Sequence, residues 1–72
     1  DTYFNISYEL EEAQYVFISI FNAQGHYLYR MTKFTDTVQE RVSTANWENG
    51  TYYVQILLKS KKVSEELKVI HN

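Results

Sequence analysis

The side chains that could do acid–base chemistry are few in this chain and far apart along it. A nucleophile, a base and an acid can be combined on paper from Ser43, His26 and Asp36, and the second histidine, His71, lies near the end. Catalysis requires such groups to converge and to be held in orientation by their neighbours. Nothing in the spacing of these residues indicates that they converge. We therefore expect a protein that is not an enzyme.

Metal binding has equally little support in the sequence. A zinc site needs three or four clustered nitrogen, sulfur or oxygen ligands, and no spacing suggests such a cluster. The chain has no Cys. Glu9, Glu11 and Glu12 are candidate oxygen ligands for Ca²⁺, but a glutamate-rich turn is more often simply solvated. We expect neither a metal nor any other cofactor.

Length and composition indicate what kind of protein to expect. The chain has 72 residues, enough for one small domain, which we assign to residues 1–72. Its formal net charge of −2 argues against a nucleic-acid partner, which requires a clustered basic face. No apolar run approaches the roughly 20 residues of a membrane-spanning helix. Seven Tyr, four Phe and one Trp bury a large area per residue, which helps so short a chain to form a core.

The strongest local signals are a turn and the strand that follows it. Asn49-Gly50 is a turn signal, because Gly adopts positive φ without steric cost. Residues 51–58 are then β-branched, aromatic or aliphatic apart from one Gln, as in a central strand. Trp47, just before the turn, is predicted to be largely buried and to close one end of the core. Alternation places four side chains of the strand inward: Tyr52, Val54, Ile56 and Leu58.

Five further segments have the period-two pattern of strands. They are separated by polar links, including residues 11–14, residues 35–37 and a turn at Gly25. Six short strands without a convincing helix predict an all-β protein, an immunoglobulin-like antiparallel β-sandwich of six to seven short strands. The five further strands are expected at residues 2–10, 15–22, 27–34, 38–44 and 63–70.

Two of these strands carry polar residues that need a particular place. Residues 38–44 form the most polar strand, so we place it at a sheet edge, with Val42 and Thr44 inward. In residues 63–70, Glu65 falls on the same face as the apolar side chains. Either Glu65 lies at the rim of the core, or a β-bulge shifts the register of this strand.

The strand at residues 15–22 presents aromatic rings on the face opposite to its apolar one. If Val16, Ile18 and Ile20 face the core, the rings of this strand face away from it. A soluble monomer rarely leaves such a stripe in water. Either the rings are covered by the opposite sheet, by loops or by rim packing, or they form a docking face for an upstream domain, a translocon component or a second copy. The rings are Tyr15, Phe17 and Phe21, joined by Tyr53 from the strand at 51–58.

Three blocks of sequence stand out as an ordered set. The first is Ile6-Ser7-Tyr8-Glu9-Leu10. The second is residues 16–25, VFISIFNAQG, in which alternating hydrophobic residues lead into aromatic-Asn-x-x-Gly, and the third is residues 50–56, GTYYVQI. In order and spacing they resemble the C-terminal sorting domain of the type IX secretion system, also called the Por secretion system. The comparison points Leu28 and Met31 inward, which requires a bulge between them.

This resemblance implies a function in binding rather than in chemistry. Such domains are seven-stranded sandwiches at the C-terminus of larger secreted proteins of Gram-negative bacteria. Outer-membrane secretion machinery reads them, and a sortase-like protease usually removes them while the cargo is anchored to surface lipopolysaccharide. The resemblance thus implies an upstream cargo domain, passage through the periplasm and outer membrane, and a secreted or cell-surface location. The family usually begins with a Pro-Asn-Pro block, which this chain lacks, so we expect the chain to be a fragment of a longer protein.

The resemblance also implies which residues are read by the machinery. The sheet edges and the last strand are the expected recognition elements. The family often has Lys early in its last strand, where this chain has Glu66, so recognition either tolerates this change or shifts to Lys68. The alternative function is an immunoglobulin- or fibronectin-like adhesion or carbohydrate-binding module that uses the aromatic stripe, and self-association remains open. The recognition residues are expected to be Gly50, Tyr52, Lys68, Val69 and Ile70.

Overall fold

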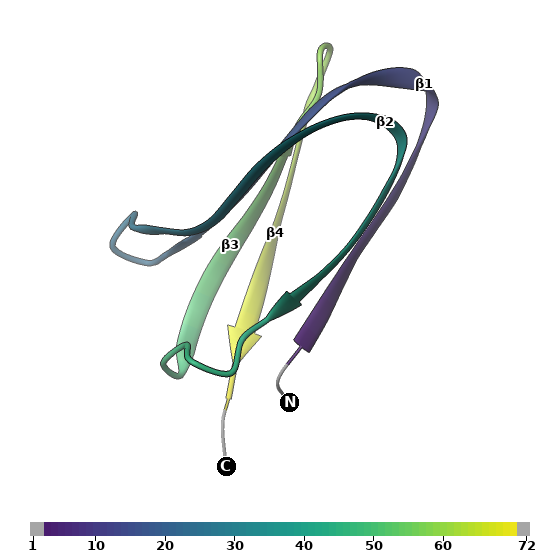
Figure 1. The fold of residues 1–72 in the computed structure, drawn as a ribbon. Helices are drawn as coiled ribbons and strands as arrows, with labels where there is room; N and C mark the ends of the chain where they lie inside the picture. The colour runs from purple at the N-terminus through teal and green to yellow at the C-terminus, as the bar shows by residue number, and fades with distance from the viewer. Residues whose placement is uncertain (1–2, 71–72) are drawn as a thin grey trace.

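The fold is one antiparallel sheet of four strands, seen in a computed structural model that describes residues 3–70 (Figure 1). The strands are β1 (Tyr3–Asn22), β2 (Tyr27–Ser43), β3 (Gly50–Leu57) and β4 (Lys62–Val69). Their order in the sheet is β2-β1-β3-β4, so β2 and β4 are the edge strands. The all-β class is confirmed, as are the edge position of residues 38–44 and the central position of the strand that begins at Gly50.

The six predicted strand segments are present, but as four strands. β1 contains the first two segments and β2 the next two, and each strand runs through the link that was expected to end it. The predicted polar links at residues 11–14 and 35–37 are therefore wrong as strand breaks. Neither link contains Gly or Pro, the residues that most often end a strand at a tight turn.

A bulge takes the place of these two links. Pairing between β1 and β2 passes from Glu9↔Thr37 directly to Gln14↔Thr35, so four residues of β1 lie opposite one residue of β2. The side chain of Thr35 holds the β2 side of this bend, because its Oγ1 accepts a hydrogen bond from the Thr37 N–H at 3.0 Å. A bulge of this size bends both strands sharply without ending either of them.

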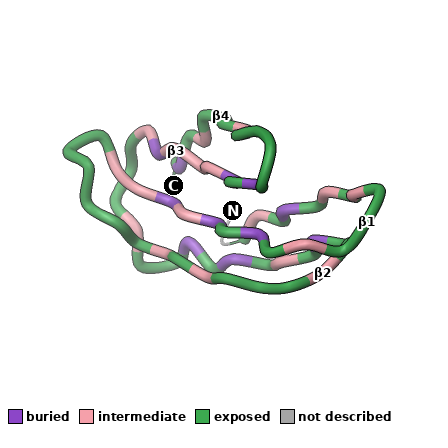
Figure 2. Tube along the Cα trace, turned by 90° about the horizontal axis from the view of Figure 1, so that it is seen from above, coloured by how far each residue is buried: buried purple, intermediate pink, exposed green. Residues whose placement is uncertain are grey.

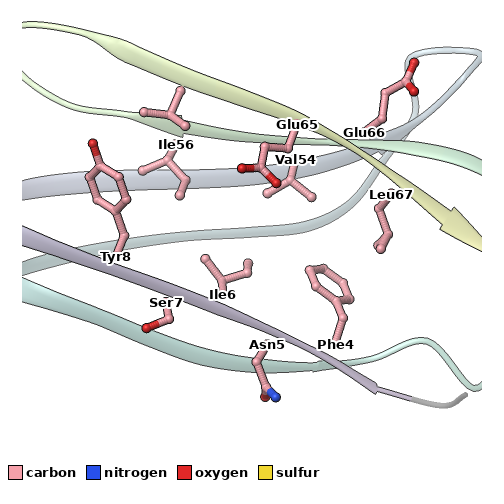
Figure 3. A pocket seen from close by; sticks show the side chains of 11 residues that line it. Phe4, Asn5, Ile6, Ser7, Tyr8, Val54, Ile56, Glu65, Glu66 and Leu67 are labelled. Carbon is pink, nitrogen blue, oxygen red and sulfur yellow. The ribbon is translucent and has the colours of Figure 1, made fainter.

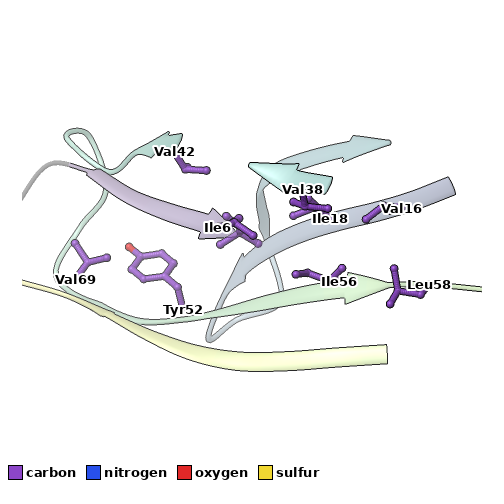
Figure 4. Packing of buried hydrophobic residues seen from close by; sticks show 10 residues of the cluster. Ile6, Val16, Ile18, Val38, Val42, Tyr52, Ile56, Leu58 and Val69 are labelled. Atoms are coloured by element: carbon purple, nitrogen blue, oxygen red, sulfur yellow. The ribbon is translucent and has the colours of Figure 1, made fainter. Parts of the chain in front are cut away.

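The bend folds residues 3–9 of β1, together with the paired residues 37–43 of β2, over the rest of the sheet. We call this part the folded arm. Figure 2 shows β3 and β4 in one layer and the folded arm of β1 and β2 in another. The sheet thus has two facing layers like a sandwich, but it is one open sheet of four strands and not the six- to seven-stranded sandwich expected. The core lies between the layers (Figure 4), and its buried side chains are Ile6, Val16, Ile18, Ile20, Val38, Val42, Tyr52, Ile56, Leu58 and Val69.

The predicted inward faces are largely confirmed. Tyr52, Ile56 and Leu58 are buried, and Val54 packs against them from the same face of β3. Val42 and Thr44 are buried at the end of β2. The pairing of β3 with β4 is continuous, without a register shift, so the alternative of a bulge near Glu65 is wrong. Glu65 lies at the rim of the core.

The two glycines occupy the backbone conformations that their turns require. Gly25 has φ 87° and Gly50 has φ 158°, so both are positive as predicted. At the β1–β2 turn, Asn22 Oδ1 accepts hydrogen bonds from the backbone N–H groups of Gln24 at 3.0 Å and His26 at 2.9 Å. This side chain therefore fixes the turn that Gly25 makes sterically possible.

One residue of β2 departs from the inward orientation expected for it. The register between β1 and β2 shifts after Ile20↔Tyr29, which makes Leu28 the extra residue of a bulge. Leu28 is consequently exposed, whereas Met31 packs against the core. The prediction for Met31 is confirmed, and the prediction for Leu28 is wrong because the bulge lies at Leu28 itself.

Trp47 is partly buried, not largely buried as predicted. It lies in the loop between β2 and β3 and packs against the core at one end of the molecule. Its ring meets Phe4 edge-on, with centroids 6.3 Å apart, and Tyr52 at a tilt, with centroids 4.9 Å apart. The loop leaves part of the indole in contact with water.

Candidate recognition surfaces

The residues that the resemblance marks for recognition meet at one end of the β3–β4 hairpin. Gly50 pairs with Val69, which brings the start of β3 beside the end of β4. Val69 and Tyr52 are buried, so they hold this end in shape and expose little surface of their own. Lys68 is exposed, and Ile70, just after β4, is 64% exposed. The surface offered here therefore consists of a basic and an apolar side chain above a fixed turn.

β4 has a hydrogen-bonded neighbour on one side only, because the sheet ends with it. Its other edge leaves backbone groups available to a further strand. Half of its eight positions are charged, which protects the edge against unspecific pairing. Within residues 3–70, none of these charged side chains makes a hydrogen bond or an ion pair. They are Lys62, Glu65, Glu66 and Lys68.

The outward face of the sheet, which we call the aromatic face, carries two clusters of rings. In the first, Tyr15 and Phe34 are 61% and 60% exposed, with centroids 5.1 Å apart. Phe17 and Leu57 lie opposite each other on β1 and β3 and are also exposed. The alternative in which an opposite sheet covers these rings is wrong, because the second layer folds onto the other face.

The second cluster is centred on Phe21. Its ring lies 5.6 Å from that of Tyr53, in a stacked arrangement, and 5.7 Å from that of Tyr27. Phe21 and Tyr53 are half-buried by this mutual packing. Arg30 lies over the Tyr27 ring at 4.5 Å, which places a positive charge at the edge of the cluster.

Sequence reasoning missed two members of the aromatic face, Tyr27 and Phe34. Both belong to β2, and their positions beside Phe21 and Tyr15 depend on the β1–β2 register. That register is set by two bulges. One lies at the bend, where the polar residues predict strand breaks instead, and the other lies at Leu28 itself, not between Leu28 and Met31. Aromatic residues at both ends of the predicted strand 27–34 are the only signal that was present.

A small polar cluster joins the parts of β2 that lie before and after its bend. The Tyr29 hydroxyl donates to Glu40 Oε1 at 3.4 Å, and Lys33 Nζ lies 3.6 Å from the other oxygen of that carboxylate. Burial raises the pKa of Tyr29 above its ordinary value, and the nearby negative charge of Glu40 raises it further. The tyrosine therefore stays protonated and serves as a hydrogen-bond donor.

The structure does not bring Ser43, His26 and Asp36 together as a catalytic triad. Ser43 ends β2, Asp36 lies at the bend in the middle of that strand, and His26 precedes its first residue. His71 lies outside the described residues. No group of three or more His, Asp or Glu side chains within residues 3–70 is placed to hold a metal ion. In the same part of the chain, no helix is long and apolar enough to cross a membrane.

These features define a class of protein. Residues 3–70 form an all-β fold that offers strand edges and exposed aromatic rings, features through which proteins often recognise other macromolecules. Residues 1–71 match the family described as the secretion system C-terminal sorting domain. The chain belongs to this family of type IX secretion sorting domains, and the resemblance seen in the sequence is confirmed. No curated protein and no solved structure gives a significant match.

Family membership carries consequences for the protein around the domain. The family is one of sorting signals and is not a catalytic family. A type IX sorting domain implies an upstream cargo, a secretion machinery that reads the domain, and a secreted or cell-surface protein exported through the outer membrane.

Proposed function

We propose that this domain is a non-catalytic sorting signal whose recognised part is the end of the β3–β4 hairpin around Gly50, Lys68 and Ile70. Outer-membrane machinery binds this end, and a sortase-like protease then removes the domain while the cargo is anchored at the cell surface. The domain contributes a rigid surface of fixed shape and performs no chemistry itself.

The observation that carries this proposal is the exposure of Ile70 beside Lys68. The Ile70 side chain is apolar and 64% exposed at the end of an edge strand. A partner that covers it removes apolar surface from water, which favours binding. The adjacent ammonium group of Lys68 has no ion-pair partner within residues 3–70, so a partner carboxylate can orient on it. Gly50 and the buried Val69 keep both side chains at a fixed position.

Glu66, which stands where the family often has Lys, lies on the same outward face of β4 as Lys68. The two residues are two positions apart, so their side chains project from the same side of the strand. In this proposal Lys68, two residues nearer to the end of the strand than Glu66, supplies the basic contact that the family often has at the position of Glu66.

The test is secretion of a reporter fused to the domain in a type IX-competent strain. Lys68→Glu should lower secretion, while Lys62→Glu should not, because Lys62 lies on the same face of β4 at its other end. Ile70→Ser should likewise lower secretion. Leu57→Ser is its control and should not lower secretion, because it removes an apolar side chain that is 48% exposed elsewhere on the sheet. Thermal melts should be unchanged for all four variants. Equal secretion by the two lysine variants would contradict the assignment of the recognised end.

A further inference from the structure

A groove opens between the folded arm of β1 and the hairpin of β3 and β4. It has a volume of about 210 Å³. Figure 3 shows Phe4, Ile6 and Tyr8 pointing into it from β1, with Val54 and Leu67 across from them. The walls are therefore mostly apolar, although the groove is open to solvent along the side where β1 and β4 do not meet.

The β1 wall of this groove is a free strand edge. Residues 3–9 of β1 pair with β2 on one side. On the other side they have no described strand partner, because β3 pairs with β1 only from Phe17 to Asn22. An extended segment lying in the groove would find the backbone N–H and C=O groups of this edge available for pairing.

This edge lacks the protection that the other edges carry. β4 has four charged residues among eight, and β2 has charged side chains along its length, including Arg30, Lys33 and Glu40. Residues 3–8 of β1, YFNISY, contain no charged residue. Charged side chains on an edge strand discourage the addition of another strand, so their absence here leaves this edge open to it.

Glu65 places a carboxylate at the groove, so a ligand that covers the groove needs a positive charge. It belongs to the groove-facing row of β4, between Val63 and Leu67, and Figure 3 shows its carboxylate beside Val54. No hydrogen bond or ion pair joins this carboxylate to any of residues 3–70. Covering the groove with an apolar segment would remove water from the carboxylate, which is costly unless the segment supplies a positive charge.

We propose that the groove binds one extended strand of a partner polypeptide, which pairs with residues 3–8 of β1 and carries a Lys or Arg opposite Glu65. Six paired residues span about 20 Å at ~3.3 Å per residue. Alternate side chains of the ligand strand fill the space between Ile6 and Leu67. This inference goes beyond the sorting function, since the groove does not include Lys68 or Ile70.

A second copy of the chain fits the groove less well than such a partner. Of its own free edges, residues 3–8 of β1 carry no Lys or Arg that could meet Glu65. β4 carries Glu65 on its apolar row, so its insertion would bring a second carboxylate into the same groove. The apolar row of β2 is already used in the core, through Val38 and Val42. The charge of the groove thus favours a basic partner strand over self-pairing.

The test uses the whole domain and three synthetic peptides of about nine residues, long enough for an edge strand. Each alternates Val and Thr and carries one Lys, shifted by one position between peptides. Calorimetry should detect binding of at least one peptide, and the same peptide with Glu in place of Lys should not bind. Peptide with N-methylated backbone amides should also fail, because it cannot pair with the strand edge.

Two variants of the domain locate the site. Glu65→Gln should weaken binding by about tenfold, the usual effect of losing one charged hydrogen-bonded pair. Glu66→Gln is the matched control: Glu66 also borders the groove, but its carboxylate projects from the face of β4 opposite to that of Glu65 (Figure 3), so its loss should leave affinity unchanged. In amide hydrogen exchange, added peptide should protect residues within 3–8 of β1.

Three results would overturn the proposal. The first is that none of the Lys peptides binds. The second is equal weakening by both Gln variants, or protection that falls only on β2 or on the outward side of the sheet. The third is a dimer in analytical ultracentrifugation without peptide, with residues 3–8 already protected, because a second copy would then be the occupant.

Discussion

The Tyr52 hydroxyl donates a hydrogen bond to the backbone carbonyl of Glu48 at 2.6 Å. Tyr52 is buried in the core, while Glu48 belongs to the exposed loop between β2 and β3. The bond therefore ties the loop to the core across the Asn49-Gly50 turn, in the manner of a tyrosine corner. Trp47 packs against the same ring, so one tyrosine holds both the backbone and the main side chain of this loop.

Tyr52→Phe should remove this tie while keeping the ring in place. We expect the free energy of unfolding to fall by about 0.5–1.5 kcal/mol, the usual net value of one hydrogen bond. Urea denaturation would measure the loss. Tyr53→Phe is the control, because Tyr53 lies on the outward face and no hydrogen bond of its hydroxyl to residues 3–70 is present. Equal losses in the two variants would contradict the role assigned to the bond.

Gly50→Val should destabilise the domain by more than about 1 kcal/mol, because a β-branched residue is strained at positive φ. Nothing lies within 4 Å of a Cβ built at Gly50, so the cost comes from the backbone conformation and not from a clash. Gly50→Ala should accordingly show a loss as well. Chemical denaturation of both variants tests this, and an Ala variant as stable as the parent would mean that the backbone at this position is relaxed.

Trp47→Ala should cost about 2–3 kcal/mol, below the roughly 3–5 kcal/mol of a fully buried ring, because one side of the indole is in water. The tryptophan emission maximum of the parent domain should lie between those of buried and fully exposed indole. Phe34→Ala provides the comparison, since Phe34 is a ring that is 60% exposed and packs edge-on against Tyr15 on the outward face. A larger loss from Phe34→Ala than from Trp47→Ala would show that the loop contributes little to the core.

Tyr29 should make stability fall at alkaline pH. Its pKa in the folded state is raised by burial first and by Glu40 second, so the folded state holds this proton more tightly than the unfolded state does. The contribution is complete below the unfolded pKa of about 10 and is lost as pH rises through the folded value. Tyr29→Phe should flatten this part of the stability curve, and Glu40→Gln should lower the pKa of Tyr29 toward its ordinary value. Spectrophotometric titration of tyrosinate would detect that shift, and its absence would contradict the contact with Glu40.

The sequence alone determined where the strand segments lie and which of their faces point inward. Backbone alternation places successive side chains on opposite faces, so the buried positions of Ile6, Ile18 and Ile56 follow from local pattern. Positive φ at Gly25 and Gly50 follows in the same way, because the turn residues themselves carry the signal. The family was likewise readable, since its ordered blocks are a property of the chain and need no coordinates.

Only the tertiary structure decided how these segments join. A bulge forms where two strands lose register, and register depends on which strand becomes a neighbour, so Glu9, Gln14 and Leu28 gave no local sign of it. The same cause hid the aromatic partners of Tyr15 and Phe21 on β2. The groove beside Phe4 and Glu65 exists because the bend carries residues 3–9 across the core from β4, and residues about sixty positions apart meet there only after the whole sheet has folded.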